Sequence, residues 1–242
     1  MLFEDSKEEL RINKFLRMYA NISRRQADKL IQQGKVRINN KIAAHGELVT
    51  PEDKIYLFNN RIIPRRIIYR YILLNKPIGY ICSKVGDKTV FDLLKREREG
   101  LNYVGRLDVN TSGALLFTND GVMANCLMKS NVSRIYEVSL DTVLSHDAVE
   151  LLKQGPSLDG ELVKLGKVKI YKRDIEIELF EGRQREVRRI FESLGSKVIK
   201  LNRISFAGIS INTLLISKYR ELSSSEIREL IKIKKIEVKS IR

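Results

Sequence analysis

A single carboxylate lies in a loop bracketed by two glycines. Asp108 belongs to the stretch VGRLDVNTSGALLFTNDG (104–121), between Gly105 and Gly113, and an apolar run follows at once. Glycine adopts backbone conformations that other residues resist, and the Asn-Asp-Gly sequence that ends the stretch is a turn signal. The pattern predicts a loop, a buried strand, a turn and a helix, with Asp108 and Arg106 on a loop anchored at both ends. A rigid scaffold commonly presents catalytic residues on such loops.

A second stretch, EGRQREVRRIFESLG (181–195), combines arginines with a helical pattern. Its apolar residues recur at helical spacing from Val187 to Leu194, and a glycine follows to end the helix. Arg188 falls at the edge of this apolar stripe, whereas Arg185 and Arg189 fall on the far side. Arg188 is therefore the arginine best placed to reach a partly buried site, and its alternative role is a surface ion pair or packing of its stem.

The elements that must position these residues form a sheet-rich pattern from residue 70 onward. The expected strands and helices alternate, and Tyr136 lies on the core side of its strand. We expect a strand at 71–74, its hairpin partner at 79–82, helices at 91–99 and 122–129, and strands at 134–140 and 175–179.

The first sixty residues have a different organisation. Helical spacing covers 11–20, and a second helix begins at Ser23 with Gln26 in the capping-box position and ends at Gly34; short strands follow at 35–39 and 54–58. The segment 61–69 has no clear period and is predicted to be a linker. A cluster of basic residues marks the second helix and the strand after it, and we expect it to contact RNA phosphates rather than form an ordinary solvated face: Arg24, Arg25, Lys29, Lys35 and Arg37.

Composition narrows the class of partner. The 242 residues carry 45 Lys and Arg against 30 Asp and Glu, a net charge of +15, which favours a polyanion such as nucleic acid. The absence of a long apolar span and the acidic start argue against a membrane surface and against secretion, so we expect a cytoplasmic protein. Two distant cysteines and two isolated histidines give no metal-binding pattern, and no nucleotide-binding glycine motif is present. We therefore predict no metal and no cofactor.

The quoted motifs also carry a resemblance. GRLDVNTSGALLFTNDG resembles the signature of the ribosomal RNA pseudouridine synthases of the RsuA/RluB family, and the TSG sequence together with EGRQREVRR is closest to the large-subunit RluB type. The first sixty residues resemble the small αL-type RNA-binding domain. The resemblance implies an α+β chain, with that domain at 1–60, a linker at 61–69, and at 70–242 a pseudouridine synthase catalytic domain built on a mixed, mainly antiparallel sheet.

The resemblance also assigns roles to residues. Asp108 is the catalytic carboxylate, Arg188 pairs with it, and Tyr136 stacks on the flipped base. The NKPIGY stretch supports the floor of the active site. The remaining arginines near both motifs are expected to bind RNA: Arg106, Arg183, Arg185 and Arg189.

The implied reaction turns uridine in ribosomal RNA, free or in a ribosome precursor, into pseudouridine without a cofactor, and we expect a monomer. Whether Asp108 attacks the sugar or abstracts a proton stays open. One alternative is the same chemistry on small-subunit RNA, and another is a non-enzymatic RNA-binding or ribosome-assembly protein. A third is a metal-dependent nuclease built on Asp108 and Asp120, which lacks an obvious carboxylate cluster.

Overall fold

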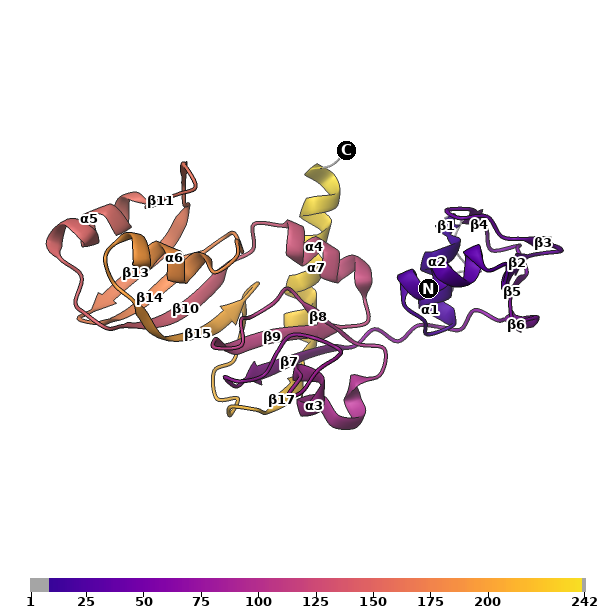
Figure 1. Cartoon of the computed structure of the whole chain (residues 1–242), viewed down its shortest axis with the longest axis horizontal. Helices are drawn as coiled ribbons and strands as arrows, with labels where there is room; N and C mark the ends of the chain where they lie inside the picture. The colour runs from indigo at the N-terminus through magenta and orange to yellow at the C-terminus, as the bar shows by residue number, and fades with distance from the viewer. Residues whose placement is uncertain (1–8, 241–242) are drawn as a thin grey trace. The chain divides into compact units, whose positions relative to one another are not determined.

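The computed structural model describes residues 9–240, and side chains to residue 234. The chain divides into two compact units, Met1–Ile68 and Tyr69–Arg242. From residue 9 onward, the first unit contains two helices and six short strands (Figure 1): β1 (Leu10–Arg11), α1 (Ile12–Tyr19), α2 (Arg24–Gln32), β2 (Val36–Ile38), β3 (Lys41–Ile42), β4 (Leu48–Val49), β5 (Ile55–Leu57) and β6 (Asn60–Ile62). Strand β6 pairs with β5. The N-terminal sheet therefore continues into the segment predicted as a linker from residue 61.

The two N-terminal helices begin and end where their sequence signals predict. Ser23 precedes α2, and its Oγ accepts a hydrogen bond from the Gln26 backbone N–H at 3.2 Å. Gly34 follows the helix with φ of +67°, a conformation that glycine adopts without steric cost. Phe15 of α1 packs on Tyr19 with their ring centroids 4.9 Å apart, within one apolar core shared by helices and sheet. The predicted helices are confirmed.

The second unit contains a larger sheet and several helices. Its elements are β7 (Tyr71–Lys76), α3 (Val90–Leu94), the 3-10 helix η2 (Lys95–Arg98), β8 (Asn102–Val104), β9 (Ser112–Thr118), α4 (Gly121–Lys129), β10 (Arg134–Leu140), α5 (His146–Gln154), β11 (Ser157–Leu158), β12 (Glu161–Leu162), β13 (Leu165–Tyr171), β14 (Asp174–Leu179), α6 (Glu186–Ser193), β15 (Val198–Phe206), β16 (Ile209–Ser210), β17 (Tyr219–Glu221) and α7 (Ser224–Ser240). Among the helices that the structure describes, none is long and apolar enough to cross a membrane.

The main sheet has nine strands and one parallel contact. Its order is β13-β14-β10-β15-β9-β7-β17, with β16 beside β15 and β8 beside β9. All pairs are antiparallel except β9 and β15, which run parallel at Asn202 opposite Ser112 and Arg203 opposite Gly113. The predicted mixed, mainly antiparallel sheet is confirmed. The predicted hairpin partner at 79–82 is wrong, because that segment makes only an isolated bridge from Ile81 to Thr89.

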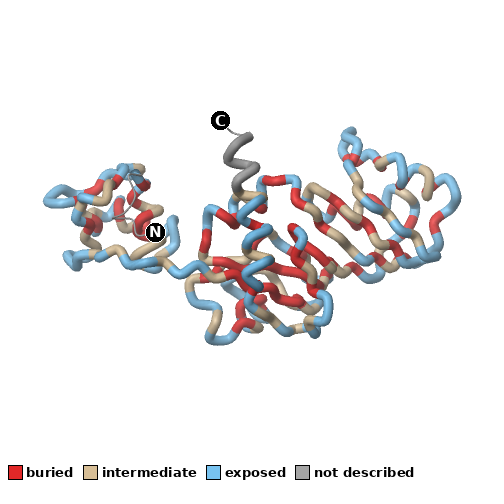
Figure 2. Tube along the Cα trace, turned by 180° about the vertical axis from the view of Figure 1, so that it is seen from behind, coloured by how far each residue is buried: buried red, intermediate tan, exposed pale blue. Residues whose placement is uncertain are grey.

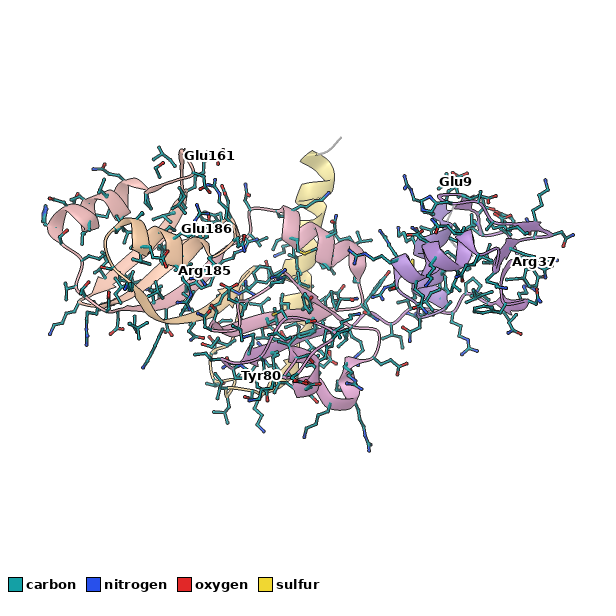
Figure 3. The ribbon with its side chains drawn as sticks, viewed as in Figure 1. Glu9, Arg37, Tyr80, Glu161, Arg185 and Glu186 are labelled. Atoms are coloured by element: carbon teal, nitrogen blue, oxygen red, sulfur yellow. The ribbon has the colours of Figure 1, made fainter. Side chains whose placement is uncertain are left out.

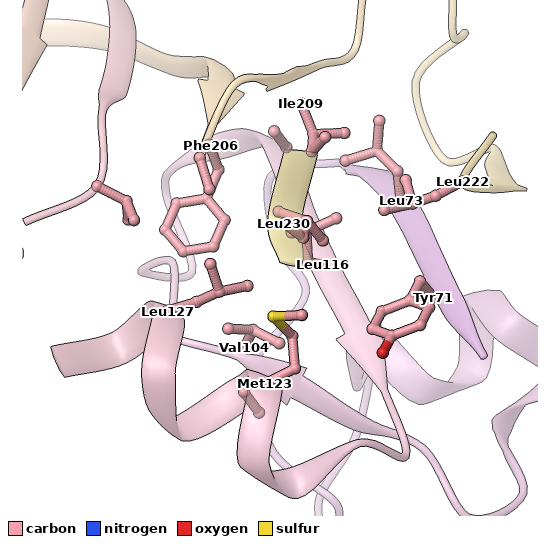
Figure 4. Close-up of a cluster of buried hydrophobic side chains, with 14 of the residues drawn as sticks. Tyr71, Leu73, Val104, Leu116, Met123, Leu127, Phe206, Ile209, Leu222 and Leu230 are labelled. Carbon is pink, nitrogen blue, oxygen red and sulfur yellow. The ribbon is translucent and has the colours of Figure 1, made fainter. Parts of the chain in front are cut away.

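Helices cover both faces of β7 and β9, which explains why every residue of β7 is buried. Leu73 and Leu116 face α4 and α7, where Met123, Leu127 and Leu230 complete the cluster shown in Figure 4. The alternate residues face α3 in a second cluster. Figure 2 shows these central strands as the main buried part of the unit.

The other half of the sheet has its own core. Helices α5 and α6 pack on β10, β14 and β15, with Leu152, Ile190 and Phe191 buried against Val138 and Ile177. The predicted stripe of the 187–194 helix is therefore its buried side. Each half thus has an apolar core, and the parallel pairing of β9 with β15 joins the two halves.

Candidate active site

A buried lysine fixes the loop that carries Asp108. Lys76, the last residue of β7, has no exposed surface, and its Nζ donates hydrogen bonds to the carbonyl oxygens of Pro77, Asp108 and Thr111 at 3.0, 3.1 and 2.8 Å. Burial lowers the pKa of Lys76. Three carbonyl acceptors satisfy the ammonium group, so the backbone of the loop is held while the Asp108 side chain stays half-buried.

The same loop is anchored on its other side. Leu107 is buried in the cluster under α3, and its backbone N–H donates to Sγ of Cys82 at 3.5 Å. The Thr111 N–H donates to the Asp108 carbonyl at 3.1 Å, which closes a tight turn. Asp108 is therefore presented by a loop whose backbone is bonded before, at and after the carboxylate.

Gly113 allows the two halves of the sheet to meet beside this loop. Its φ is +110°, and a Cβ placed there would lie 2.2 Å from the carbonyl oxygen of Arg203. Any other residue would push β15 away from β9. The glycine that closes the Asp108 loop thus brings the side chains of β15 next to it.

A cleft of about 700 Å³ opens over this junction. The Asp108 loop, β10, β15 and the segment leading into α6 contribute residues to its walls. Six of the predicted site residues line it: Arg106, Asp108, Tyr136, Arg183, Arg185 and Arg188. The cleft therefore collects the three residues expected to be catalytic and three of the nine expected to bind RNA.

The remaining predicted residues lie elsewhere. Arg24, Arg25, Lys29 and Lys35 are exposed in the N-terminal unit, along α2 and just after it. Arg37 is half-buried on β2 and stacks over the ring of Tyr56 at 5.4 Å, and Figure 3 labels it. In the second unit Arg189 is not a wall residue of the cleft.

Arg188 lies in the cleft, but it does not pair directly with Asp108. The side chain is 6% exposed, and its Nη1 and Nη2 donate to the carbonyl oxygens of Val198 at 3.0 Å and Asn110 at 2.9 Å. Burial lowers the pKa of Arg188, and the negative charge of Asp108 partly opposes that shift. Within the described residues no ion pair joins the two groups. The Asn110 carbonyl oxygen accepts the hydrogen bond of the guanidinium, so Arg188 holds the loop two residues beyond the carboxylate.

Tyr136 lines the same cleft as the Asp108 loop. It is half-buried on β10, packs against the core under α6, and pairs across the sheet with Ile177 on β14 and Arg203 on β15. Its strand position agrees with the sequence pattern. Its ring therefore lines the cleft from a rigid strand rather than from a loop.

Two of the predicted RNA-binding arginines form ion pairs with a short acidic hairpin. Strands β11 and β12 form it, and its carboxylates Asp159 and Glu161 pair with Arg189 and Arg183, the second pair at 2.7 Å. Arg183 also pairs with Glu181 at 2.7 Å. Figure 3 labels Glu161 together with Arg185 and Glu186 of this region. Both hairpin carboxylates are exposed, so solvent screens these pairs.

Sequence reasoning missed three charged residues of the site and did not single out a fourth within the NKPIGY stretch. Arg134, Glu186 and Arg203 line the cleft and are buried, and Lys76 of that stretch lies under the loop. The sequence signals for these residues are weak, because each residue lies in or beside a strand or helix whose pattern is explained by structure alone. Only the pairing of distant segments brings their charged groups to Asp108.

Asp120, the second aspartate considered for a nuclease, has a structural role. It is 4% exposed; its Oδ1 accepts the N–H groups of Val122 and Met123 at 3.0 Å, and its Oδ2 accepts the Tyr71 hydroxyl at 2.9 Å. This is an N-cap of α4. Among the described residues, no group of three or more His, Cys, Asp and Glu is placed to hold a metal ion.

Comparison with known proteins gives the family of this site. A family model described as RNA pseudouridylate synthase matches residues 70–193, and an S4 domain model matches residues 10–55. The chain belongs to the RNA pseudouridylate synthase family. A crystal structure of a pseudouridylate synthase superposes with a TM-score of 0.67 at 30% identity and covers 91% of this chain and 99% of that chain.

Curated relatives of this pseudouridine synthase extend over nearly the whole chain. An uncharacterised RNA pseudouridine synthase of Aquifex aeolicus is 35% identical and covers 93% of this chain and 94% of its own. The ribosomal large subunit pseudouridine synthase B of Bacillus subtilis is 34% identical, over 91% and 95%. The ribosomal small subunit pseudouridine synthase A of Haemophilus influenzae is 32% identical, over 92% and 100%. The chain is thus an isomerase with an S4 domain before its catalytic domain.

Proposed function

We propose that the chain converts specific uridines of large-subunit ribosomal RNA into pseudouridine in the cleft around Asp108. The observation that carries this proposal is the cleft itself, which is lined by the half-buried Asp108 together with Tyr136 and several arginines. The reaction breaks the bond from N1 to C1′, turns the base and joins C5 to C1′. Atoms and oxidation state balance, so the residues of the cleft supply the chemistry.

Two carboxylates line the cleft, and only Asp108 suits the role. Glu186 is 5% exposed, and its Oε2 accepts the Arg183 backbone N–H at 3.2 Å at the start of α6. Burial raises the pKa of Glu186, which disfavours its charged form. Asp108 has a side chain exposed to the cleft and a backbone that Lys76 holds. It therefore serves as the nucleophile or base of the reaction.

The base must leave the RNA stack to reach Asp108. A uridine stacked in a helix does not present its glycosidic bond, and enzymes acting on bases flip them into a pocket. The cleft of about 700 Å³ has room for a nucleotide. Tyr136 is the aromatic side chain expected to stack on the flipped uracil, a contact worth about 1 to 3 kcal/mol.

The relatives are the basis for choosing ribosomal RNA as the substrate, and for choosing large-subunit over small-subunit RNA. Relatives named for both subunits match this chain at similar identity, and the large-subunit type is slightly more similar. We keep the small subunit as the second candidate. We also propose that the enzyme acts as a monomer, because one chain supplies every group named above. We place it in the cytoplasm, where ribosomal RNA is assembled into ribosomes.

Incubation of the protein with separate large- and small-subunit ribosomal RNA transcripts tests this proposal. The readout is pseudouridine detected by chemical modification and primer extension, together with intact strands on a denaturing gel. We expect pseudouridine at defined positions of the large-subunit transcript. Modification of the small-subunit transcript alone would overturn the subunit assignment, and absence of pseudouridine from both RNAs and from ribosome precursors would overturn the function.

The basic face of α2 is expected to provide RNA affinity rather than chemistry. Replacing Arg24, Arg25 and Lys29 with glutamine removes three exposed charges outside the cleft. Removing one charge that binds a phosphate lowers the slope of log affinity against log salt by about one unit, so the slope should fall by up to about three. The single-turnover rate at saturating RNA should stay within about twofold of the wild-type value.

A second triple variant controls for net charge. Lys164, Lys167 and Lys172 are equally exposed beside and along the edge strand β13, and their replacement with glutamine removes the same charge. We expect this variant to retain the wild-type salt slope. Equal slopes for the two triple variants would show that α2 is not a dedicated RNA surface.

The acidic hairpin is expected to compete with RNA for Arg183 and Arg189. Asp159→Asn combined with Glu161→Gln removes the hairpin carboxylate from both guanidinium groups, and Arg183 keeps its pair with Glu181. Exposed pairs of this kind are worth about 0 to 1 kcal/mol each, so RNA affinity should rise about two- to tenfold with little change in stability. Glu150→Gln combined with Glu176→Gln changes the net charge equally at two other exposed pairs. If filter binding gives the same affinity for both double variants, only net charge is at work.

A further inference from the structure

Three buried arginines line the cleft without a carboxylate partner. Arg134 and Arg188 are each 6% exposed and Arg203 is 3% exposed, and within the described residues none of them forms an ion pair. Burial lowers the pKa of Arg134 and of Arg188. A buried charge without a partner is costly, so a site that keeps three such groups has a use for positive charge.

The three guanidinium groups differ in what they already bind. Nη1 of Arg134 donates to the carbonyl oxygens of Val132 and Phe180, and both terminal nitrogens of Arg188 are bonded to backbone carbonyls. Among the described residues, the Arg203 side chain makes one hydrogen bond, from Nε to the Ala114 carbonyl at 2.9 Å. Its terminal Nη2 is buried and has no hydrogen-bond partner within that part of the chain. Arg203 is thus the arginine of the cleft whose terminal donor is buried and unsatisfied.

The fold holds this donor beside the reacting groups. Arg203 pairs across the sheet with Tyr136 on one side and with Gly113 on the other. Its guanidinium lies 4.7 Å from the ring of Phe206, which Figure 4 shows within the apolar cluster beside Leu127. The positive charge also acts on the thiol of Cys82, the acceptor of the Leu107 N–H in the Asp108 loop. The group is therefore fixed at the Asp108 end of the cleft.

The reaction needs a cation at that place. When the bond from N1 to C1′ breaks, its electron pair stays on the base, and the uracil anion spreads the charge over N1 and the two exocyclic oxygens. C5 then bonds to C1′, the proton on C5 leaves, and N1 takes up a proton. A carboxylate repels the intermediate anion, whereas an arginine stays protonated and donates hydrogen bonds to it.

We propose that Arg203 is a catalytic residue that donates a hydrogen bond from its guanidinium to an exocyclic oxygen of the departing uracil anion. This inference rests on the proposed pseudouridine synthesis and adds the group that stabilises the leaving base. It gives Arg203 a role different from that of Arg188, whose terminal nitrogens hold the loop.

A change of leaving group tests the proposal. Fluorine at C5 withdraws electrons and stabilises the uracil anion, so 5-fluorouridine needs less help from the enzyme. The substrate is a ribosomal RNA transcript in which the wild-type enzyme modifies a mapped uridine, prepared with uridine or with 5-fluorouridine. Single-turnover loss of the original nucleoside at saturating RNA is followed by nuclease digestion and chromatography, which reports cleavage of the glycosidic bond for both substrates.

We expect Arg203→Met to slow cleavage of uridine by about 10²- to 10³-fold, the usual effect of removing one donor to a developing anion. The loss should be at least about tenfold smaller with 5-fluorouridine, because the better leaving group replaces part of that stabilisation. Arg203→Lys keeps the charge without the planar fork, so its cleavage rates should fall between those of wild type and Arg203→Met.

Arg134→Met is the matched control. Arg134 is buried in the same cleft and lies over the same Phe206 ring at 5.5 Å, but its Nη1 is bonded to two carbonyl oxygens. Arg134→Met should lower the cleavage rate by the same factor for uridine and for 5-fluorouridine, whatever the size of that factor and whatever its effect on stability. Equal losses for both substrates in Arg203→Met, or no loss, would overturn the inference, as would failure of both Arg203 variants to fold. A wild-type enzyme that forms no pseudouridine would instead overturn the proposed function.

Discussion

Replacement of Asp108 with asparagine is expected to abolish pseudouridine formation, with a loss on the order of 10⁴-fold or more, as when other catalytic nucleophiles are removed. The change keeps the shape of the side chain and removes its charge. Lys76 holds this loop through the carbonyl oxygens of Asp108 and Thr111, which the substitution leaves in place. RNA affinity and the unfolding temperature should therefore stay close to the wild-type values.

The measurement is the single-turnover rate at saturating RNA, with binding measured separately by fluorescence anisotropy. Asp147→Asn is the control, because Asp147 is almost fully exposed on α5 and lies outside the cleft. It should retain full activity. A rate for Asp108→Asn within tenfold of wild type would mean that another group performs the chemistry.

Replacement of Arg188 with alanine is expected to slow the saturating rate by about 10²-fold or more, because a small displacement of a catalytic group has an effect of that size. The guanidinium joins Asn110 of the Asp108 loop to Val198 at the start of β15. Hydrogen bonds from a charged group contribute about 1.5 to 3 kcal/mol each, so the free energy of unfolding should fall by about 3 kcal/mol or more. Arg188→Lys restores part of this loss, since one ammonium lacks the fork that spans both carbonyls.

Arg185→Ala and Arg189→Ala are the matched variants on the same helix and its N-cap. Arg185 is exposed and Arg189 is paired with the exposed Asp159. Both changes should weaken RNA binding, and a higher RNA concentration should restore the rate. Equal saturating rates for all three alanine variants, each shown to be folded by thermal unfolding, would exclude the loop-holding role of Arg188.

The sequence predicts best the features that depend on a few neighbouring residues. The cap of α2 needs only Ser23 and the Gln26 N–H, and the helix after the Asp120 turn needs only the aspartate and the next two N–H groups. These signals lie within three residues. The strand that carries Tyr136 and the helix that carries Arg188 are also predicted from local sequence, by the spacing of their apolar residues.

The features that escape prediction depend on contacts between distant segments. The resemblance places the NKPIGY stretch at the floor of the active site, but nothing local marks its Lys76 as the group that binds a loop more than thirty residues away, or Arg203 as a neighbour of Gly113. The partner of Arg188 was wrong for the same reason, because the direction of the Asn110 carbonyl is set by the turn that Lys76 holds. The partners of these residues are fixed only when the distant strands pair in the sheet.

The parallel contact between β9 and β15 also sets the order in which the enzyme gains its two abilities during its own synthesis. Ala114 and Arg203 are 89 residues apart in the chain. At about 5 to 20 residues per second, roughly 4 to 18 seconds separate their emergence from the ribosome, whereas the N-terminal unit is complete and compact before either appears. A nascent chain therefore gains its RNA-binding module first, and the cleft closes around Asp108 only when β15 arrives.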